Sequence, residues 1–195
     1  MKRIACLTAL LLSALLTGCT INHPIDKDYA EYLANNQGES ALPQAQAPAS
    51  YGLTEQTRNH HYEFRAATVG YAHLWIVDFG KLLDTTLQSR DVQKAFGSLQ
   101  QGSAAGDAPY LVLNLEQYRF EDYRAYVTLN IEVQSAGKAL FSKRYSVEGK
   151  SQGGKMWLGG PFAMKNATQQ STKLAIDEIL RSFIQDYNQL QLSQR

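Results

Sequence analysis

A glycine-rich segment late in the chain carries the pattern of a phosphate-binding loop. Residues 149–155 fit G-x-x-x-x-G-K and follow a segment that alternates like a strand. Met156 occupies the position at which a Ser or Thr hydroxyl would bind Mg²⁺, and Gly159-Gly160-Pro161 should prevent a helix from starting directly after the lysine. We therefore expect no nucleotide site here, but a mobile loop between the last strand and the last helix.

The same loop, which extends to residue 162, is unusual because it contains large apolar side chains. Loops are usually polar, yet Met156, Trp157 and Phe162 lie within this one. Trp157 and Phe162 either fold under the last helix as a lid on the core or remain exposed as a contact for a partner or for lipid. The sequence leaves both alternatives open.

A second candidate contact is the aromatic and cationic segment 118–126. Its aromatic residues, with Tyr118 and Tyr123 among them, interleave with Arg119 and Arg124, so the segment can stack on sugars or contact a protein. The alternative is cross-strand aromatic pairing that stabilises an exposed hairpin.

The titratable residues do not suggest catalysis or metal binding. His60 and His61 are adjacent, so on a strand they point to opposite faces and cannot chelate one metal together. The sequence contains no G-x-S-x-G motif, no H-E-x-x-H motif and no cysteine nucleophile. We therefore expect a protein that is not an enzyme and that uses no cofactor and no metal.

Cys19 lies at the end of an N-terminal export signal. The basic pair Lys2-Arg3 precedes an apolar run over residues 4–16, which is too short to span a bilayer and is typical of a signal peptide. Residues 16–19, Leu-Thr-Gly-Cys, resemble the lipobox of bacterial lipoproteins. The alternative is an ordinary secretory signal followed by a coincidental cysteine.

The lipobox resemblance implies a location and a partner. Residues 1–18 would be removed as a signal peptide, and Cys19 would carry acyl chains that bind the lipid bilayer. Thr20 stands where an Asp would retain a lipoprotein in the inner membrane, so the resemblance implies a lipid-anchored protein of the outer membrane that faces the periplasm.

Charge and cysteine content narrow the possible partners. The chain has 19 Lys and Arg against 18 Asp and Glu, and removal of Lys2 and Arg3 leaves the mature protein at −1. Because nucleic-acid binding needs a basic surface, we expect no nucleic-acid partner. Cys6 would leave with the signal and Cys19 would be acylated, so the domain must be stable without a disulfide.

The chain divides by composition into a tether and one domain. Residues 19–58 are poor in large aliphatic residues and rich in Asn, Gln, Ala, Pro, Ser and Gly, which indicates a lipidated tether. A short helix over residues 26–36 would form only if it docked on something. Residues 59–195 have the patterning of a single periplasmic domain.

Periodicity predicts the order β-α-β-β-β-α within that domain. We expect a strand over 60–69, a helix with an apolar stripe over 75–87 and a C-terminal helix that opens at Asn166 with Gln169 as a capping-box partner. Gly80 is either a point of close packing or a weak position in the first helix. Three strands lie between the helices: the first alternates over 110–115 and leads to a polar tip near 121–122, and the others lie at about 126–133 and 139–147. The prediction is an α+β two-layer sandwich, in which two helices cover one face of an antiparallel sheet of about four strands.

This order of elements resembles the small periplasmic α+β domains of Gram-negative outer-membrane lipoproteins. These include the lipopolysaccharide-assembly lipoprotein and the auxiliary lipoproteins of ABC-type transport systems, and the resemblance covers roughly residues 60–190. It implies a non-enzymatic accessory or binding module in cell-envelope assembly or transport, with an envelope protein as partner. The alternative is a carbohydrate- or lipid-binding lipoprotein that uses the Tyr-rich hairpin and the Trp157 loop.

Overall fold

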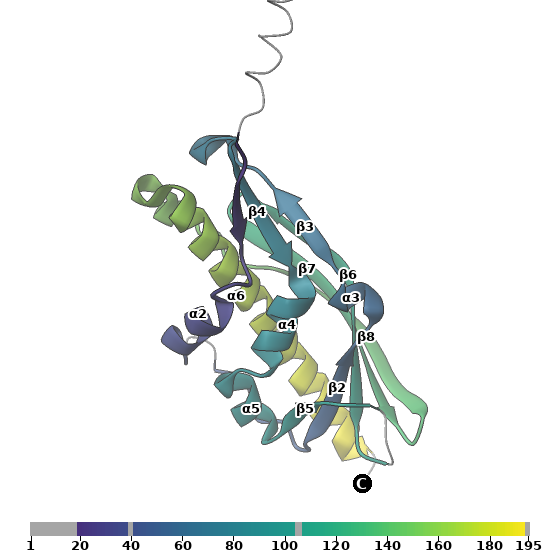
Figure 1. The fold of residues 1–195 in the computed structure, drawn as a ribbon. Helices are drawn as coiled ribbons and strands as arrows, with labels where there is room; N and C mark the ends of the chain where they lie inside the picture. The colour runs from purple at the N-terminus through teal and green to yellow at the C-terminus, as the bar shows by residue number, and fades with distance from the viewer. Residues whose placement is uncertain (1–18, 39–40, 104–106, 194–195) are drawn as a thin grey trace, which may run out of the picture.

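Three long antiparallel strands form most of the larger of two sheets (Figure 1). They are β6 (Tyr110–Glu121), β7 (Arg124–Ser135) and β8 (Lys138–Glu148) in a computed structural model that describes residues 19–38, 41–103 and 107–193. Alternation directs Leu129 and Ile131 of β7 into the core, as their spacing predicts. The predicted three-strand meander is confirmed.

The larger sheet is mixed rather than antiparallel. Its order is β5-β2-β6-β7-β8, in which β2 (Ala49–Leu53) runs parallel to both β6 and β5 (Leu99–Gln101). Both added strands are too short to show a periodic pattern, and β2 lies in the segment expected to be a tether. The predicted sheet of about four antiparallel strands is therefore wrong in detail.

A second sheet of three strands has the order β1-β4-β3. It consists of β1 (Ile21–Pro24), which pairs in parallel with β4 (His73–Asp78), and β3 (His61–Phe64), which pairs antiparallel with β4. The spacing predicts Trp75 on the first long helix, but it lies on β4. Trp75 and Val77 are both fully buried at a spacing of two, which is the period of a strand.

Helices cover one face of the larger sheet (Figure 1). The longest, α6 (Met156–Ser193), packs on β7 and β8, and α4 (Phe79–Leu87) contacts α6. The shorter ones are α2 (Tyr29–Asn35), α3 (Glu55–Arg58), α5 (Arg90–Phe96) and the 3₁₀ turns η1 (Ala67–Val69) and η2 (Gly153–Lys155). The fold is thus a mixed α+β arrangement, with more strands and helices than the sequence predicted.

The predicted tether, residues 19–58, is wrong because this segment is folded into the domain. Ile25, Tyr29 and Tyr51 are fully buried, and the Tyr29 hydroxyl lies 3.1 Å from Thr86 Oγ1 of α4. The large side chains in this segment are too few and too irregularly spaced to form a periodic pattern, so their burial depends on partners distant in sequence. The predicted signal peptide, residues 1–18, lies outside the described residues.

The C-terminal helix starts earlier than predicted. Gly160 (φ 51°, ψ −143°) interrupts α6, and Pro161 begins the long uninterrupted part, where proline is favoured. The predicted capping box at Asn166 and Gln169 is therefore wrong, since both residues lie inside the helix. The predicted buried stripe is confirmed for Ile176, Ile179, Leu180, Phe183, Ile184 and Tyr187.

Gly80 is a point of close packing between α3 and α4. A Cβ at this position would lie 2.5 Å from the carbonyl oxygens of Thr57 and Arg58, so no larger residue fits without moving the backbone. No helix in the described part of the chain is long and apolar enough to cross a membrane.

Candidate functional site

Cys19 is exposed and lies two residues before Ile21, where β1 begins. Only Thr20 separates it from β1. The backbone N–H of Ile21 donates to the Ala72 carbonyl at 2.8 Å, and Arg65 Nη2 donates to Thr20 Oγ1 at 3.3 Å. The residue immediately after Cys19 is therefore already held by the fold.

A pair of histidines joins β1 to β4 near this end. His23 Nε2 and His73 Nδ1 are 2.8 Å apart, and the His23 ring stacks on the buried Trp75 with the centroids 5.5 Å apart. Partial burial lowers the pKa of His23, and the neighbouring His73 and Lys165 lower it further. His23 is therefore neutral near pH 7, and β1 is attached by side chains as well as by its backbone.

Three large apolar side chains are exposed at the same end, and we call them the anchor-end patch. Ile21, Tyr71 and Phe162 have exposed fractions of 47%, 69% and 76%. Tyr71 follows the η1 turn, and Phe162 is the second residue of the long part of α6, after Pro161. The two segments meet because Met164 and Thr68 line the same surface hollow.

The predicted Gly-rich loop is largely helical. The η2 turn is followed directly by one helical turn from Met156, so the expectation that no helix starts after Lys155 is wrong. Met156 is partly buried against the core, whereas Phe162 is exposed. Phe162 therefore does not form part of a lid on the core. The side chain of Trp157 lies outside the described part of the structure.

The predicted aromatic hairpin does not form one surface. A bulge between Leu115 and Gln117 shifts the register, so Tyr118 points into the core, where its hydroxyl lies 2.9 Å from Thr172 Oγ1. Burial raises the pKa of Tyr118. On the opposite face, the Arg119 guanidinium lies 3.8 Å from the centre of the Tyr126 ring.

The two remaining hairpin candidates are used for local contacts. Tyr123 lies in the β6–β7 turn with a φ of 59° and donates from its hydroxyl to Thr68 Oγ1 at 3.2 Å. Arg124 Nη1 donates to Glu148 Oε2 at 3.2 Å across the sheet. The structure therefore disperses Tyr118, Tyr123 and Arg124 instead of bringing them together.

The two adjacent histidines point apart, as predicted. His60 packs edge-on against Phe79, with ring centroids 6.2 Å apart, whereas His61 is exposed and bonds to Asp78 at 2.8 Å and Glu63 at 3.1 Å. These two carboxylates raise the pKa of His61. Across residues 19–38, 41–103 and 107–193, no group of three or more His, Cys, Asp or Glu residues could hold a metal.

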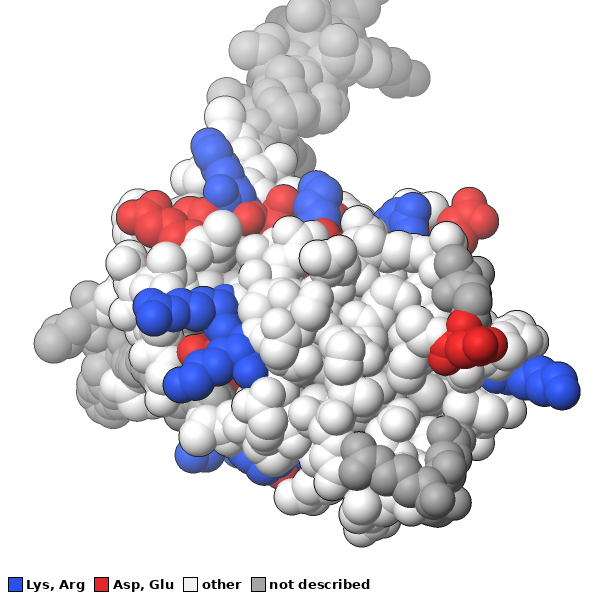
Figure 2. All heavy atoms as spheres, turned by 90° about the horizontal axis from the view of Figure 1, so that it is seen from below, with Lys and Arg blue, Asp and Glu red and all other residues white. Residues whose placement is uncertain are grey.

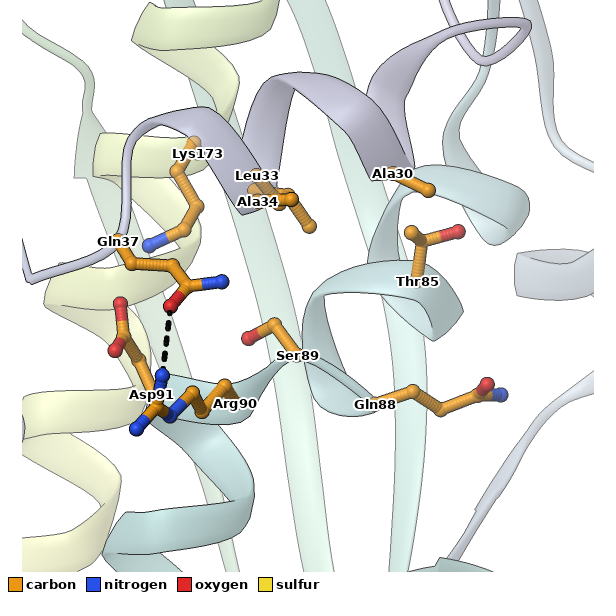
Figure 3. A pocket seen from close by; sticks show the side chains of 10 residues that line it. All are labelled: Ala30, Leu33, Ala34, Gln37, Thr85, Gln88, Ser89, Arg90, Asp91 and Lys173. Atoms are coloured by element: carbon orange, nitrogen blue, oxygen red, sulfur yellow. Dashed lines mark hydrogen bonds between the residues drawn. The ribbon is translucent and has the colours of Figure 1, made fainter.

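A polar pocket of about 270 Å³ lies between α2, α6 and the α4–α5 junction (Figure 3). Lys173 extends into it from α6, and on the opposite wall Arg90 Nη1 donates to Gln37 Oε1 at 3.3 Å. Lys173 forms a buried ion pair with Asp177 one turn along α6, so its charge is already compensated. The volume is small for a ligand site, where about 300–1,000 Å³ is usual.

Sequence reasoning missed this pocket because Lys173 lies on the buried side of α6 among apolar residues. Its ion pair with Asp177 at a spacing of four is a pattern that usually belongs to an exposed helix face. The signal that could have indicated this pocket is the charged pair Lys173 and Asp177 within an otherwise apolar, buried stripe of α6. The pocket is lined by mixed polar groups, and its charged residues are Lys173, Arg90 and Asp91.

Comparison with known proteins supports the fold and leaves the activity open. No family model and no curated protein matches the sequence. A crystal structure of a Xanthomonas campestris protein assigned to the family DUF330 is similar, with a TM-score of 0.50 and 16% identity, over 80% of this chain and 92% of that chain. A Caulobacter crescentus structure described as a candidate lipoprotein has a TM-score of 0.44 and 14% identity, over 88% of this chain and 97% of that chain. At these identities, the Xanthomonas structure shows a shared fold.

Proposed function

We propose that this protein is a lipoprotein of the bacterial cell envelope, anchored in the outer membrane through acylated Cys19 and facing the periplasm. It would act as a non-enzymatic accessory or binding module in envelope assembly or transport. The observation that carries the proposal is the position of Cys19, which follows the lipobox-like residues 16–18 and lies exposed one residue before the folded domain begins. An acyl chain on this side chain would extend away from the core.

The end of the molecule far from Cys19 has the character of a protein contact surface. Figure 2 shows this end, in which uncharged atoms occupy most of the centre and charged residues lie towards the rim. The β7–β8 hairpin and the C-terminal part of α6 reach it (Figure 1), and Leu140 and Leu192 are exposed on these elements. An uncharged centre with a polar rim is typical of protein interfaces, which supports an envelope protein as the partner.

Metabolic labelling with an alkyne fatty acid tests the anchor. The wild-type protein is expected to incorporate the label and to fractionate with the outer membrane, whereas Cys19→Ser should remain unlabelled. Cys6→Ser is the matched control because this cysteine would be removed with the signal, so its labelling should equal that of the wild type. Labelling of Cys19→Ser would refute the proposed anchor.

The alternative of a carbohydrate or lipid binder that uses the Tyr-rich hairpin lacks such support. Its aromatic surface needs Tyr118, which is buried. Cross-linking in cells followed by mass spectrometry would identify the partner, and cross-links from the far end near Leu192 to one envelope protein are the expected result.

A further inference from the structure

We propose that the anchor-end patch, Ile21, Tyr71 and Phe162, inserts into the membrane interface and fixes the domain against the bilayer in one orientation. The inference rests on the proposed function in one respect, which is that acyl chains on Cys19 hold the protein at the membrane. Its partner is the lipid surface itself.

The first argument is distance. One residue of extended chain spans at most about 3.6 Å, so Ile21 lies within about 7 Å of the Cys19 backbone. The interfacial layer on each side of a bilayer is about 5–7 Å thick. Because β1 begins at Ile21 and pairs with β4 from its first residue, acyl chains on Cys19 would hold this edge of the folded domain at or within this layer.

The second argument is the chemistry of the exposed side chains. An exposed phenylalanine and isoleucine lose contact with water when they enter the acyl boundary, and tyrosine is enriched at membrane interfaces because its ring is apolar and its hydroxyl is polar. Three of the five exposed large hydrophobic residues in the described chain, Ile21, Tyr71 and Phe162, belong to this one end. They come from three separate elements, which are β1, the turn after η1 and the start of α6.

The third argument concerns charge. Arg65 Nη1 donates to the Tyr71 carbonyl and Nη2 to Thr20 Oγ1, so an exposed guanidinium lies beside the anchor, where it can meet lipid phosphates. The exposed acids Glu121 and Asp122 lie on the nearby β6–β7 turn, which contacts η1 through the Tyr123–Thr68 bond. Glu121 is already paired with Arg119, which leaves Asp122 to offset Arg65, so the contact should depend on apolar insertion and only weakly on salt.

The test uses the acylated protein in vesicles of phosphatidylethanolamine and phosphatidylglycerol. With Cys6 removed and Cys19 acylated, an introduced cysteine is the only free thiol, so Tyr71→Cys and Phe162→Cys can each be labelled with an environment-sensitive fluorophore. Leu192→Cys is the matched control, because Leu192 is apolar and 58% exposed but lies at the far end. All three positions are exposed, so the substitutions should leave the fold intact, which near-ultraviolet circular dichroism checks.

We expect lipid-attached nitroxides to quench the labels at 71 and 162 at least about twofold more strongly than the label at 192, with blue-shifted emission at the first two positions. Flotation of the protein with equal quenching at all three positions would overturn the inference and leave the anchor standing. Failure of the protein to float with the vesicles would refute the proposed anchor, and the inference with it.

Discussion

The replacement of Ile25 by alanine measures whether the N-terminal segment is part of the domain. Ile25 follows β1, is fully buried, and its backbone N–H donates to the Ile76 carbonyl at 2.9 Å. Truncation of a buried isoleucine to alanine costs about 2–5 kcal/mol, because the lost transfer free energy is added to the cost of a cavity. The matched control is Ile21→Ala, four residues earlier, where 47% of the residue is already exposed.

For Ile25→Ala we expect the free energy of unfolding to fall by about 3 kcal/mol, which corresponds to a Tm lower by about 6–12 °C for a domain of this size. Ile21→Ala should change it by less than about 0.5 kcal/mol, as surface substitutions usually do. Urea denaturation of the purified protein, followed by tryptophan fluorescence, gives both values because Trp75 is buried between β1 and the core.

A tether would give a different result. If residues 19–58 were outside the domain, both substitutions would be silent and a chain shortened to begin near Thr57 would unfold like the intact one. Equal, negligible effects of Ile25→Ala and Ile21→Ala would therefore refute the packing described for this segment. We expect the shortened chain to fail to fold, because it lacks β1, α2 and β2 and the buried Tyr29 and Tyr51.

Three further predictions follow from single contacts. Gly80→Ala should lower stability by about 1–3 kcal/mol in urea denaturation, since its Cβ would overlap the α3 backbone, and an unchanged midpoint would contradict this packing. Tyr51→Phe should cost about 1.5–3 kcal/mol by the same assay, because the hydroxyl donates to Asp84 Oδ1 at 2.7 Å; a neutral effect would show that water replaces the bond. Because the pKa of His61 is raised in the folded state, its protonation stabilises the fold below pH 6.5, and this stabilisation is lost as the pH rises through the folded pKa. The pKa of His23 is lowered in the folded state, so the fold loses stability as the pH falls below 6.5. Tm differences between each His→Gln variant and the wild type over pH 5–8 should therefore slope in opposite directions, and parallel slopes would refute both assignments.

The sequence predicted those elements whose buried residues repeat within one element. The alternation through Leu129, Ile131 and Val133 and the stripe through Ile176 and Phe183 belong to long segments, in which each buried residue supports the next. Strands β1 and β2 have only four and five residues. Their burial depends on pairing with β4 and β6, which are distant in sequence, so no pattern within the short strands indicates it. Trp75 illustrates the same limit, because its spacing of four to Phe79 fits a helix although the two residues lie on a strand and on the helix after it.

The candidate site was only partly predictable for a related reason. Cys19 has a local motif, and Phe162 was singled out because a large apolar residue stood in a glycine-rich stretch. Tyr118 was expected on a surface, but one bulge in β6 turned it inward, and a bulge has no clear signal in the residues around Leu115. The exposure of Tyr71 was not predicted, because it depends on how the turn after η1 projects from the fold.

The single residue between Cys19 and β1 would limit which partners the proposed lipid-anchored protein can reach. A flexible linker with the length of residues 20–58 would let the domain sweep a radius of about 35 Å around its lipid. If Cys19 is acylated as we propose, Thr20 alone in that place would let the domain move only with its acyl chains, and its encounters would take place by diffusion in the plane of the membrane. A partner that resides in the same membrane then meets the protein at a constant height, whereas a partner that belongs to another layer of the envelope must itself span the distance.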